Sequence, residues 1–237
     1  MRCLRCHRVK RRCLCLFEPK VKREAPLAIT LIQTIQERDH PKNSGTLLRL
    51  GLDRLESSLL NLASHHSPSD EQNELFRNAI DQIISPLSVK SDPSKKPVLL
   101  YPITESSINR SALPTSEIGP HHRLIVLDMT WGHSERLLRS APQVSSLARY
   151  SLHREEIESM RELTKRLGTE KFNFSDLRSG KRRVDQISTF EATLFSLVMI
   201  ERAWSKQSPS ALFRKYEPLW ESYESWLHAQ LNQRSTR

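Results

Sequence analysis

The chain has 237 residues, and 37 Lys and Arg against 27 Asp and Glu leave a formal net charge of +10. Hydrophobic residues make up 37%, with only 6 Gly and 13 Pro, which excludes collagen-like and low-complexity chains and leaves enough apolar residues for a core. A basic chain most often contacts nucleic acid, and the alternative is a generally basic surface without such a partner.

All four cysteines lie close to the N-terminus in the pattern C-x2-C-x6-C-x-C, as Cys3, Cys6, Cys13 and Cys15. A disulfide framework would spread its cysteines along a secreted chain, whereas four thiolates in one short segment suit a tetrahedral zinc site. A segment this short has no core of its own, so a metal would have to order it. His7 is an alternative ligand, and a disordered tail with incidental cysteines is the remaining alternative. We predict a zinc knuckle over residues 1–24, called the knuckle below.

The knuckle is also strongly basic, with only Glu18 and Glu24 as acidic residues. Arginine and lysine around a zinc knuckle can hold a phosphate backbone, and a solvated appendage without a ligand is the alternative. We favour an RNA contact through these basic residues, which are Arg2, Arg5, Arg8, Lys10, Arg11, Arg12, Lys20, Lys22 and Arg23.

Short apolar runs and helical patterns alternate along the body of the chain. The runs predict strands over 27–32, 98–101 and 124–127, and the leucine and isoleucine spacing predicts helices over 47–62, 70–84, 132–140 and 153–167. A polar stretch covers 33–44, and loops are expected over 85–97, 103–122 and 168–187. Strands that are apolar throughout are typical of a sheet buried on both faces. The sequence therefore predicts an α/β fold with a mainly parallel sheet flanked by helices.

Two features organise the C-terminal part. Ser188 and Glu191 fit a capping box at the start of a helix that continues through the apolar run Ala192 to Ile200. That run is the longest of its kind and falls short of the ~20 residues that a membrane span needs. Pro218 should kink or split any helix over 210–232. We expect a knuckle at 1–24, a catalytic domain at 25–202 and a helical extension at 203–237.

The N-terminus lacks the apolar segment of a secretory signal. We therefore expect a cytoplasmic location and no membrane partner.

Polar and aromatic side chains follow the predicted strands, where ligands bind in open α/β sheets. Gln33 and Glu37 follow the first strand, and Tyr101 and Pro102 follow the second. After the third, Asp128 is a candidate general base, and Trp131 offers a face on which a base can stack. An aspartate that caps the next helix and a tryptophan in the core are the alternatives.

Several catalytic motifs are absent from the sequence. It contains no glycine-rich phosphate loop, no G-x-S-x-G and no H-E-x-x-H. Readings as a phosphate hydrolase, a serine hydrolase or a metalloprotease are therefore not supported.

The order of the remaining motifs resembles the DTW-domain family of tRNA-uridine aminocarboxypropyltransferases. The matching pieces are the cysteine cluster with Arg8, Gln33 and Glu37, Asn43-Ser44 before Leu50-Gly51-Leu52, Leu99 to Pro102, Leu124 to Trp131, and Ile187 to Ala192. They span roughly residues 3–202. The family usually has Gly at the position of Met129, and a side chain there would narrow the pocket if a ligand approaches the backbone closely.

The resemblance implies a SPOUT-like fold with a C-terminal trefoil knot around the donor site. It also implies S-adenosylmethionine as donor, tRNA as partner and N3 of a uridine as acceptor, with Asp128 taking the N3 proton or orienting the base. It assigns catalytic roles to Asp128, Thr130 and Trp131, and donor binding to Tyr101, Pro102, Leu127, Ser188, Thr189 and Glu191. Together with the basic segments, it assigns tRNA contacts to Glu37, Asn43, Arg8, Arg11, Arg12, Lys181, Arg182 and Arg183, and zinc to the four cysteines.

Two alternative functions stay open beside aminocarboxypropyl transfer. One is RNA methylation from the same donor, and the other is a non-catalytic zinc-knuckle protein that binds RNA.

Overall fold

The computed structural model describes residues 1–60, 78, 96–102, 112–168 and 187–235. The chain divides into two compact units, each described by itself below. The sheet unit comprises Leu27–Arg38 and Arg54–Ser151, and the helical unit comprises Met1–Pro26, Asp39–Asp53 and Leu152–Arg237. The division into knuckle, catalytic domain and C-terminal extension stays a prediction.

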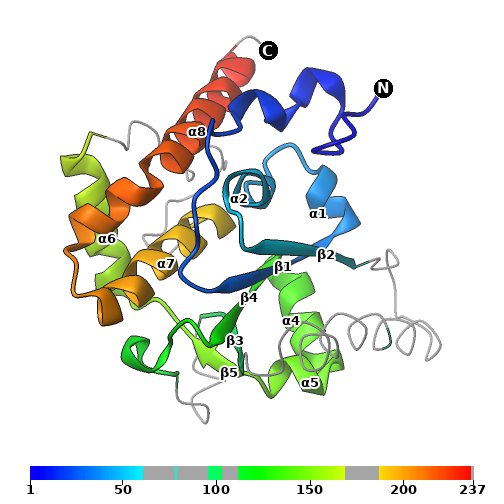
Figure 1. Ribbon diagram of the computed structural model, residues 1–237. Coiled ribbons are helices and arrows are strands. Elements are labelled where there is room, and N and C mark those ends of the chain that lie inside the picture. Colours follow the sequence, from blue (N-terminus) through cyan, green and yellow to red (C-terminus); the bar gives the residue numbers. More distant parts are fainter. Residues whose placement is uncertain (61–77, 79–95, 103–111, 169–186, 236–237) are drawn as a thin grey trace. The chain divides into compact units, whose positions relative to one another are not determined.

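Within the described residues, the sheet unit contains five parallel strands in the order β2-β1-β4-β3-β5 (Figure 1). Their bounds are Ala28–Thr34 for β1, Leu55–Leu60 for β2, Lys96–Leu100 for β3, His122–Asp128 for β4 and Ala148–Tyr150 for β5. All seven residues of β1 are buried, as expected of an inner strand of a parallel sheet. The predicted α/β class with a parallel sheet is confirmed.

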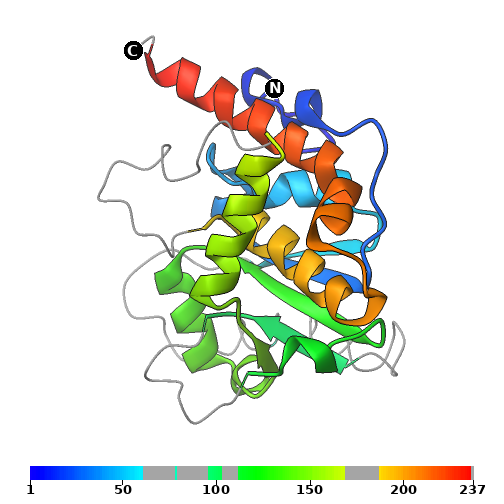
Figure 2. The ribbon, with the colours of Figure 1, turned by 90° about the vertical axis from the view of Figure 1, so that its left-hand side faces the viewer.

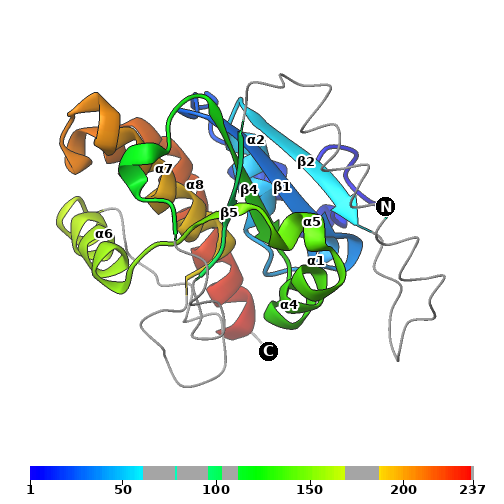
Figure 3. The ribbon, with the colours of Figure 1, turned by 90° about the horizontal axis from the view of Figure 1, so that it is seen from below.

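One face of the sheet is covered by α4 (Trp131–Ser140) and α5 (Pro142–Ser145), which lie together on that side (Figure 3). Ile32, Leu99 and Ile125 from three strands share a buried cluster with Leu137 and Val144 from these helices. Side chains alternate between faces along a strand, so Gln33 points away from the face that Ile32 occupies. The α1 helix (Ile35–Asp39) follows β1 directly.

The helix predicted over 47–62 is wrong in its second half. The α2 helix covers Gly45–Gly51, and the chain then forms β2, which pairs with β1 at the edge of the sheet. Leucines suit both structures, and the pairing partner decided between them. The short strand β5 was not predicted, because three residues carry no periodicity of their own.

In the helical unit, α7 (Thr189–Ser205) and α8 (Pro209–Ser235) pack together, and α6 (Arg154–Arg166) belongs to the same unit (Figure 2). Aromatic rings from α7 and α8 form the centre of this contact. Phe190 stacks on Tyr223 with ring centroids 4.2 Å apart, and Phe195 stacks on Trp220 at 5.7 Å. Short 3-10 turns at Lys10–Arg12 and Leu14–Phe17 shape the knuckle, and another lies at Thr115–Glu117 in the sheet unit.

The predicted capping box is confirmed. The backbone N–H of Glu191 donates to Ser188 Oγ, and the backbone N–H of Ser188 donates to the Glu191 carboxylate. The α8 helix, by contrast, runs through Pro218 without a break, so the predicted alternative of a split there is wrong, while a kink stays a prediction. Buried Tyr216 and Trp220 lie on either side of the proline, and their packing holds the helix together across the missing donor.

Some predicted segments lie largely outside the described residues, namely the helix over 70–84 and the loops over 85–97 and 168–187. The loop predicted over 103–122 is described from residue 112 onward and contains the 3-10 turn Thr115–Glu117. Lys96 and Pro97 belong to β3, and His122 belongs to β4. The trefoil knot stays a prediction. Within the described residues, no helix combines the length and the apolar character needed to cross a membrane.

Candidate functional site

Asp128 and Gln33 form a buried polar pair at the carboxyl ends of β4 and β1. The two residues lie opposite each other in the parallel ladder. Gln33 Nε2 donates to Asp128 Oδ2 over 2.6 Å, and both residues are almost fully buried. An amide donor fixes the carboxylate plane, leaving the second oxygen of Asp128 in a defined direction. The carboxyl end of β3, which is the strand predicted over 98–101, lies at the same edge of the sheet, because β3 pairs with β4 in parallel.

Thr130 and Trp131 resolve the two alternatives left open for this motif. Thr130 is the N-cap of α4, and its Oγ1 accepts from the backbone N–H of His133 over 3.4 Å. Asp128 is therefore not the cap of that helix. Trp131 is 54% exposed, so it is not a core residue, and its indole is available for stacking.

Tyr101, directly after β3, joins Trp131 and Arg149 in one cluster of the sheet unit. The rings of Tyr101 and Trp131 meet edge to face with centroids 5.8 Å apart. The Arg149 guanidinium carbon lies 5.6 Å from the Tyr101 ring centroid, within the range of a cation–π contact. Burial raises the pKa of the Tyr101 phenol, so this side chain is neutral at pH 7. Arg149 was missed from the sequence because it lies on the unpredicted strand β5.

Met129, where the family usually has Gly, packs against the hydrophobic cluster beneath α4 and α5. Leu127 packs against the same cluster. This packing directs the Met129 side chain to the face of the sheet opposite Gln33. Pro102 is exposed, and Glu37 lies in α1 with its backbone N–H bonded to Thr34 Oγ1.

The remaining predicted donor-binding residues belong to the helical unit. Ser188 Oγ lies 2.9 Å from the Tyr223 hydroxyl, so the capping box at the start of α7 is also held by α8. Ser188 and Glu191 are buried, whereas Thr189 is partly exposed. Tyr223 was missed from the sequence because nothing local marks it as a partner of Ser188.

The four cysteines are brought together. Their Sγ atoms all lie within 4.8 Å of one another, with Cys3 and Cys15 at 3.7 Å and Cys6 and Cys13 also at 3.7 Å. All four are free thiols. Zn–S bonds of about 2.3 Å in a tetrahedron place sulfur atoms about 3.8 Å apart, so this donor set fits zinc in both chemistry and spacing. The cluster is close enough to bind a metal ion.

The backbone of the knuckle supports the cysteine cluster. His7 adopts a left-handed conformation with φ 59°, and its N–H donates to the carbonyl of Cys3 over 2.8 Å. Hydrogen bonds from the backbone N–H groups of Cys6 and Arg5 lower the pKa of Cys3 to about 6, whereas burial raises that of Cys15.

The basic residues predicted to contact tRNA differ in exposure. Arg8 is only 2% exposed and donates to the carbonyls of Pro41 and Asn43, which argues against a direct phosphate contact. Asn43 is buried as well, and Arg12 is partly exposed. Lys181, Arg182 and Arg183 lie outside the described residues, as does the side chain of Arg11.

The DTW domain family matches residues 1–231, nearly the whole chain. The protein therefore belongs to the DTW-domain family, the family of tRNA-uridine aminocarboxypropyltransferases. A search of solved structures returned no match.

Proposed function

We propose that this protein transfers the 3-amino-3-carboxypropyl group of S-adenosylmethionine to N3 of a uridine in tRNA and releases methylthioadenosine. Family membership is consistent with a tRNA-modifying transferase. The observation that carries the finer proposal is the buried Gln33–Asp128 pair at the carboxyl edge of a parallel sheet.

Asp128 takes the proton from uridine N3 as this nitrogen attacks the carbon that joins the 3-amino-3-carboxypropyl group to sulfur, and the carbon–sulfur bond breaks. N3 is a weak acid, so a carboxylate within hydrogen-bond reach promotes the attack. Gln33 keeps the carboxylate in one orientation, and positioning matters because much of the acceleration comes from alignment of the two reactants.

S-adenosylmethionine, when bound, supplies the 3-amino-3-carboxypropyl group on a sulfonium sulfur. Methylthioadenosine is a good leaving group from this sulfonium. The residues assigned to S-adenosylmethionine suit this molecule, because the exposed Trp131 beside Tyr101 gives an aromatic surface for its purine. We also assign donor binding to Pro102 and Leu127 at the strand ends of the sheet unit, and to Ser188, Thr189 and Glu191 at the start of α7.

The partner is tRNA, and the chain's excess of basic residues supports a phosphate contact. We assign the direct contacts to Arg11, Arg12, Lys181, Arg182 and Arg183, with Glu37 beside the acceptor. Arg8 and Asn43 are buried, so we assign them an indirect role in tRNA binding. We assign zinc to the four cysteines and a cytoplasmic location to the protein.

The test is mass spectrometry of nucleosides from tRNA that lacks this modification, after incubation with the purified protein and S-adenosylmethionine. We expect a new nucleoside heavier than uridine by one aminocarboxypropyl group. A shift of methyl size would establish methylation instead. Bound tRNA without any mass shift would support the non-catalytic alternative.

The zinc assignment has its own test. We expect one zinc per chain by elemental analysis, and its loss in a variant with both Cys3→Ser and Cys6→Ser, because two of four ligands are removed. Cys residues occur only in this cluster, so no other thiolates can replace them. Unchanged zinc content in the double variant would contradict the assignment.

A further inference from the structure

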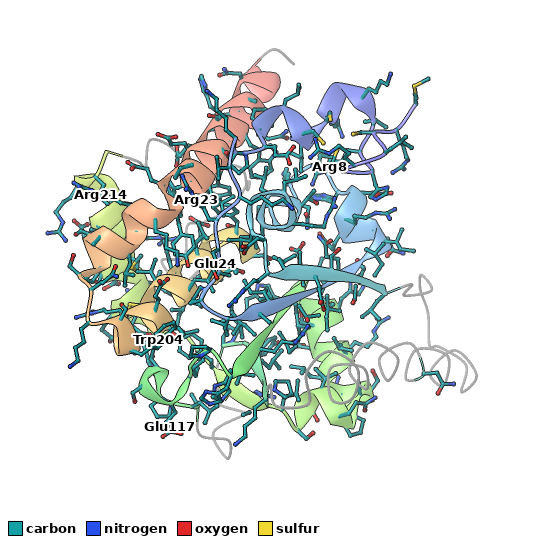
Figure 4. All side chains as sticks on the ribbon, in the orientation of Figure 1. Arg8, Arg23, Glu24, Glu117, Trp204 and Arg214 are labelled. Atoms are coloured by element: carbon teal, nitrogen blue, oxygen red, sulfur yellow. The ribbon has the colours of Figure 1, made fainter. Side chains whose placement is uncertain are left out.

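Three arginines connect the knuckle to the segment Asp39–Asp53 of the helical unit through hydrogen bonds and an ion pair. Arg8 Nη1 and Nη2 donate to the carbonyls of Pro41 and Asn43 over 2.8 and 2.7 Å. Arg2 Nη1 bonds Asp39 Oδ2 over 2.6 Å, and Arg49 Nη2 donates to the carbonyl of Arg5 over 2.8 Å. Figure 4 labels Arg8 where the knuckle meets this segment.

Arg8 differs from the other two arginines in its burial. The Arg2 side chain is 57% exposed, so its ion pair is screened by water, whereas Arg8 is 2% exposed. A buried guanidinium is costly unless its donors are satisfied, and two carbonyls of one turn match its planar fork. The contact made by Arg8 therefore depends strongly on correct placement of both partners.

The backbone of Arg8 is part of the turn that carries the cysteines. The N–H of Cys3 donates to the carbonyl of Arg8 over 2.7 Å, directly after the left-handed residue His7. One residue thus links the cysteine cluster through its backbone to Pro41 and Asn43 through its side chain.

Asn43 carries this link into α2. Its Oδ1 accepts from the backbone N–H of Thr46 over 3.2 Å and lies 3.3 Å from Thr46 Oγ1. Its carbonyl is held by Arg8 while its side chain bonds the first turn of α2 (Gly45–Gly51). Displacement of Arg8 would therefore loosen the start of this helix.

We propose that Arg8 is a positioning residue through which metal binding in the knuckle orders residues 41–51. Metal–thiolate bonds to the four cysteines would fix the turn that carries Arg8, and the guanidinium would then meet both carbonyls without further loss of freedom. Because linkage is reciprocal, the docked segment in turn strengthens metal binding. The coupling stands on these contacts alone, and only its consequence for tRNA rests on the proposed function.

Hydrogen exchange of the full chain, with zinc and after chelation, tests the coupling. In the wild type, chelation should accelerate exchange in peptides covering 41–51 by on the order of ten-fold or more, while peptides covering 124–140 in the sheet unit stay unchanged. In Arg8→Ala, the 41–51 peptides should exchange fast even with zinc. Lys10→Ala, which removes an exposed charge from the same knuckle, should behave like the wild type.

Equal acceleration in both sets of peptides on chelation would overturn the proposal, because the metal would then act on global stability. A wild-type response in Arg8→Ala would also overturn it. If Arg8→Ala does not fold, the test uses Arg8→Lys instead, and chelator competition measures its affinity for zinc. A lysine cannot satisfy both carbonyls in the same way, so affinity should fall on the order of ten-fold, and unchanged affinity would reject the coupling.

Steady-state kinetics distinguish the proposed function from the coupling. Arg8→Lys should raise KM for tRNA more than it lowers kcat, because the segment that carries Asn43 is loosened. If KM is unchanged while hydrogen exchange shows the expected coupling, the segment has no role in tRNA binding. The coupling itself would still be supported.

Discussion

Asp128 and Gln33 are the pair on which the proposed chemistry depends. A carboxylate held by an amide at the end of a buried strand is oriented before substrate arrives, which removes part of the cost of alignment. Thr130 satisfies the start of α4, so Asp128 does not serve as its cap.

Asp128→Asn should lower kcat by on the order of 10²- to 10⁴-fold, because the amide cannot accept the N3 proton. The size of the side chain is kept, so tRNA binding should stay near the wild-type value. Steady-state kinetics and a binding titration measure the two effects. Glu117→Gln is the matched control, since it removes an exposed carboxylate from the same unit. Loss of tRNA binding with an intact fold would contradict the catalytic role.

Gln33→Leu should lower kcat on the order of ten- to a hundred-fold with a smaller change in KM, because Asp128 loses the donor that orients it. The comparison is Gln36→Leu, an exposed glutamine on α1, which should leave both constants unchanged. Equal kinetics for the two variants would show that the bond does not position Asp128 for catalysis.

At the scale of elements, α2 and α8 pack closely together at Gly51. A Cβ at this position would clash with Leu219 Cδ1 and lie 3.1 Å from Pro19 Cγ. The glycine is thus required by packing, and its place at the end of α2 lets the helix contact both α8 and the knuckle. The aromatic residues of α7 and α8 then fill the interior of the same unit.

Gly51→Ala should lower the free energy of unfolding by about 1–3 kcal/mol, the usual cost of overpacking a core. Denaturant unfolding measures it. Gly132→Ala in α4 is the control: a Cβ there meets nothing within 4 Å, and alanine is the better helix former. Its stability should be unchanged or slightly higher. If Gly51→Ala unfolds like Gly132→Ala, the close approach of the two helices is not required.

At the scale of the whole molecule, the net charge of +10 sets a long-range attraction for a polyanion. Such binding weakens as salt rises, because phosphate contacts release condensed counterions. Among the basic residues of the knuckle, the exposed or partly exposed ones can reach a phosphate backbone, whereas Arg8 is buried.

A variant with Arg11→Ala and Arg12→Ala should bind tRNA more weakly and lower the slope of log K against log salt by about 2, one for each proposed phosphate contact. Titrations at several salt concentrations measure this slope. Arg154→Ala with Lys165→Ala removes the same charge from the exposed side of α6 and should have a smaller effect. An unchanged slope in the knuckle variant would place the phosphate contacts elsewhere on the chain.

Local sequence determined those features whose cause lies within a few residues. The capping box at Ser188 and Glu191 depends on side chains three positions apart, and the inner strands are marked by continuous apolar runs. The cysteine spacing predicted a metal cluster, because its ligands all lie within one short segment. The parallel sheet followed from strands that are buried on both faces.

Tertiary structure alone decided the features that depend on distant partners. Pairing with β1 and β3 turned β2 and β5 into strands, although their own sequences carry no clear period. Gln33 meets Asp128 across 95 positions of sequence, and Arg8 meets Asn43 across 35. The pattern of a sequence records which residues are buried, but ladder register and helix packing determine which buried groups meet, since those contacts form only when the whole chain folds.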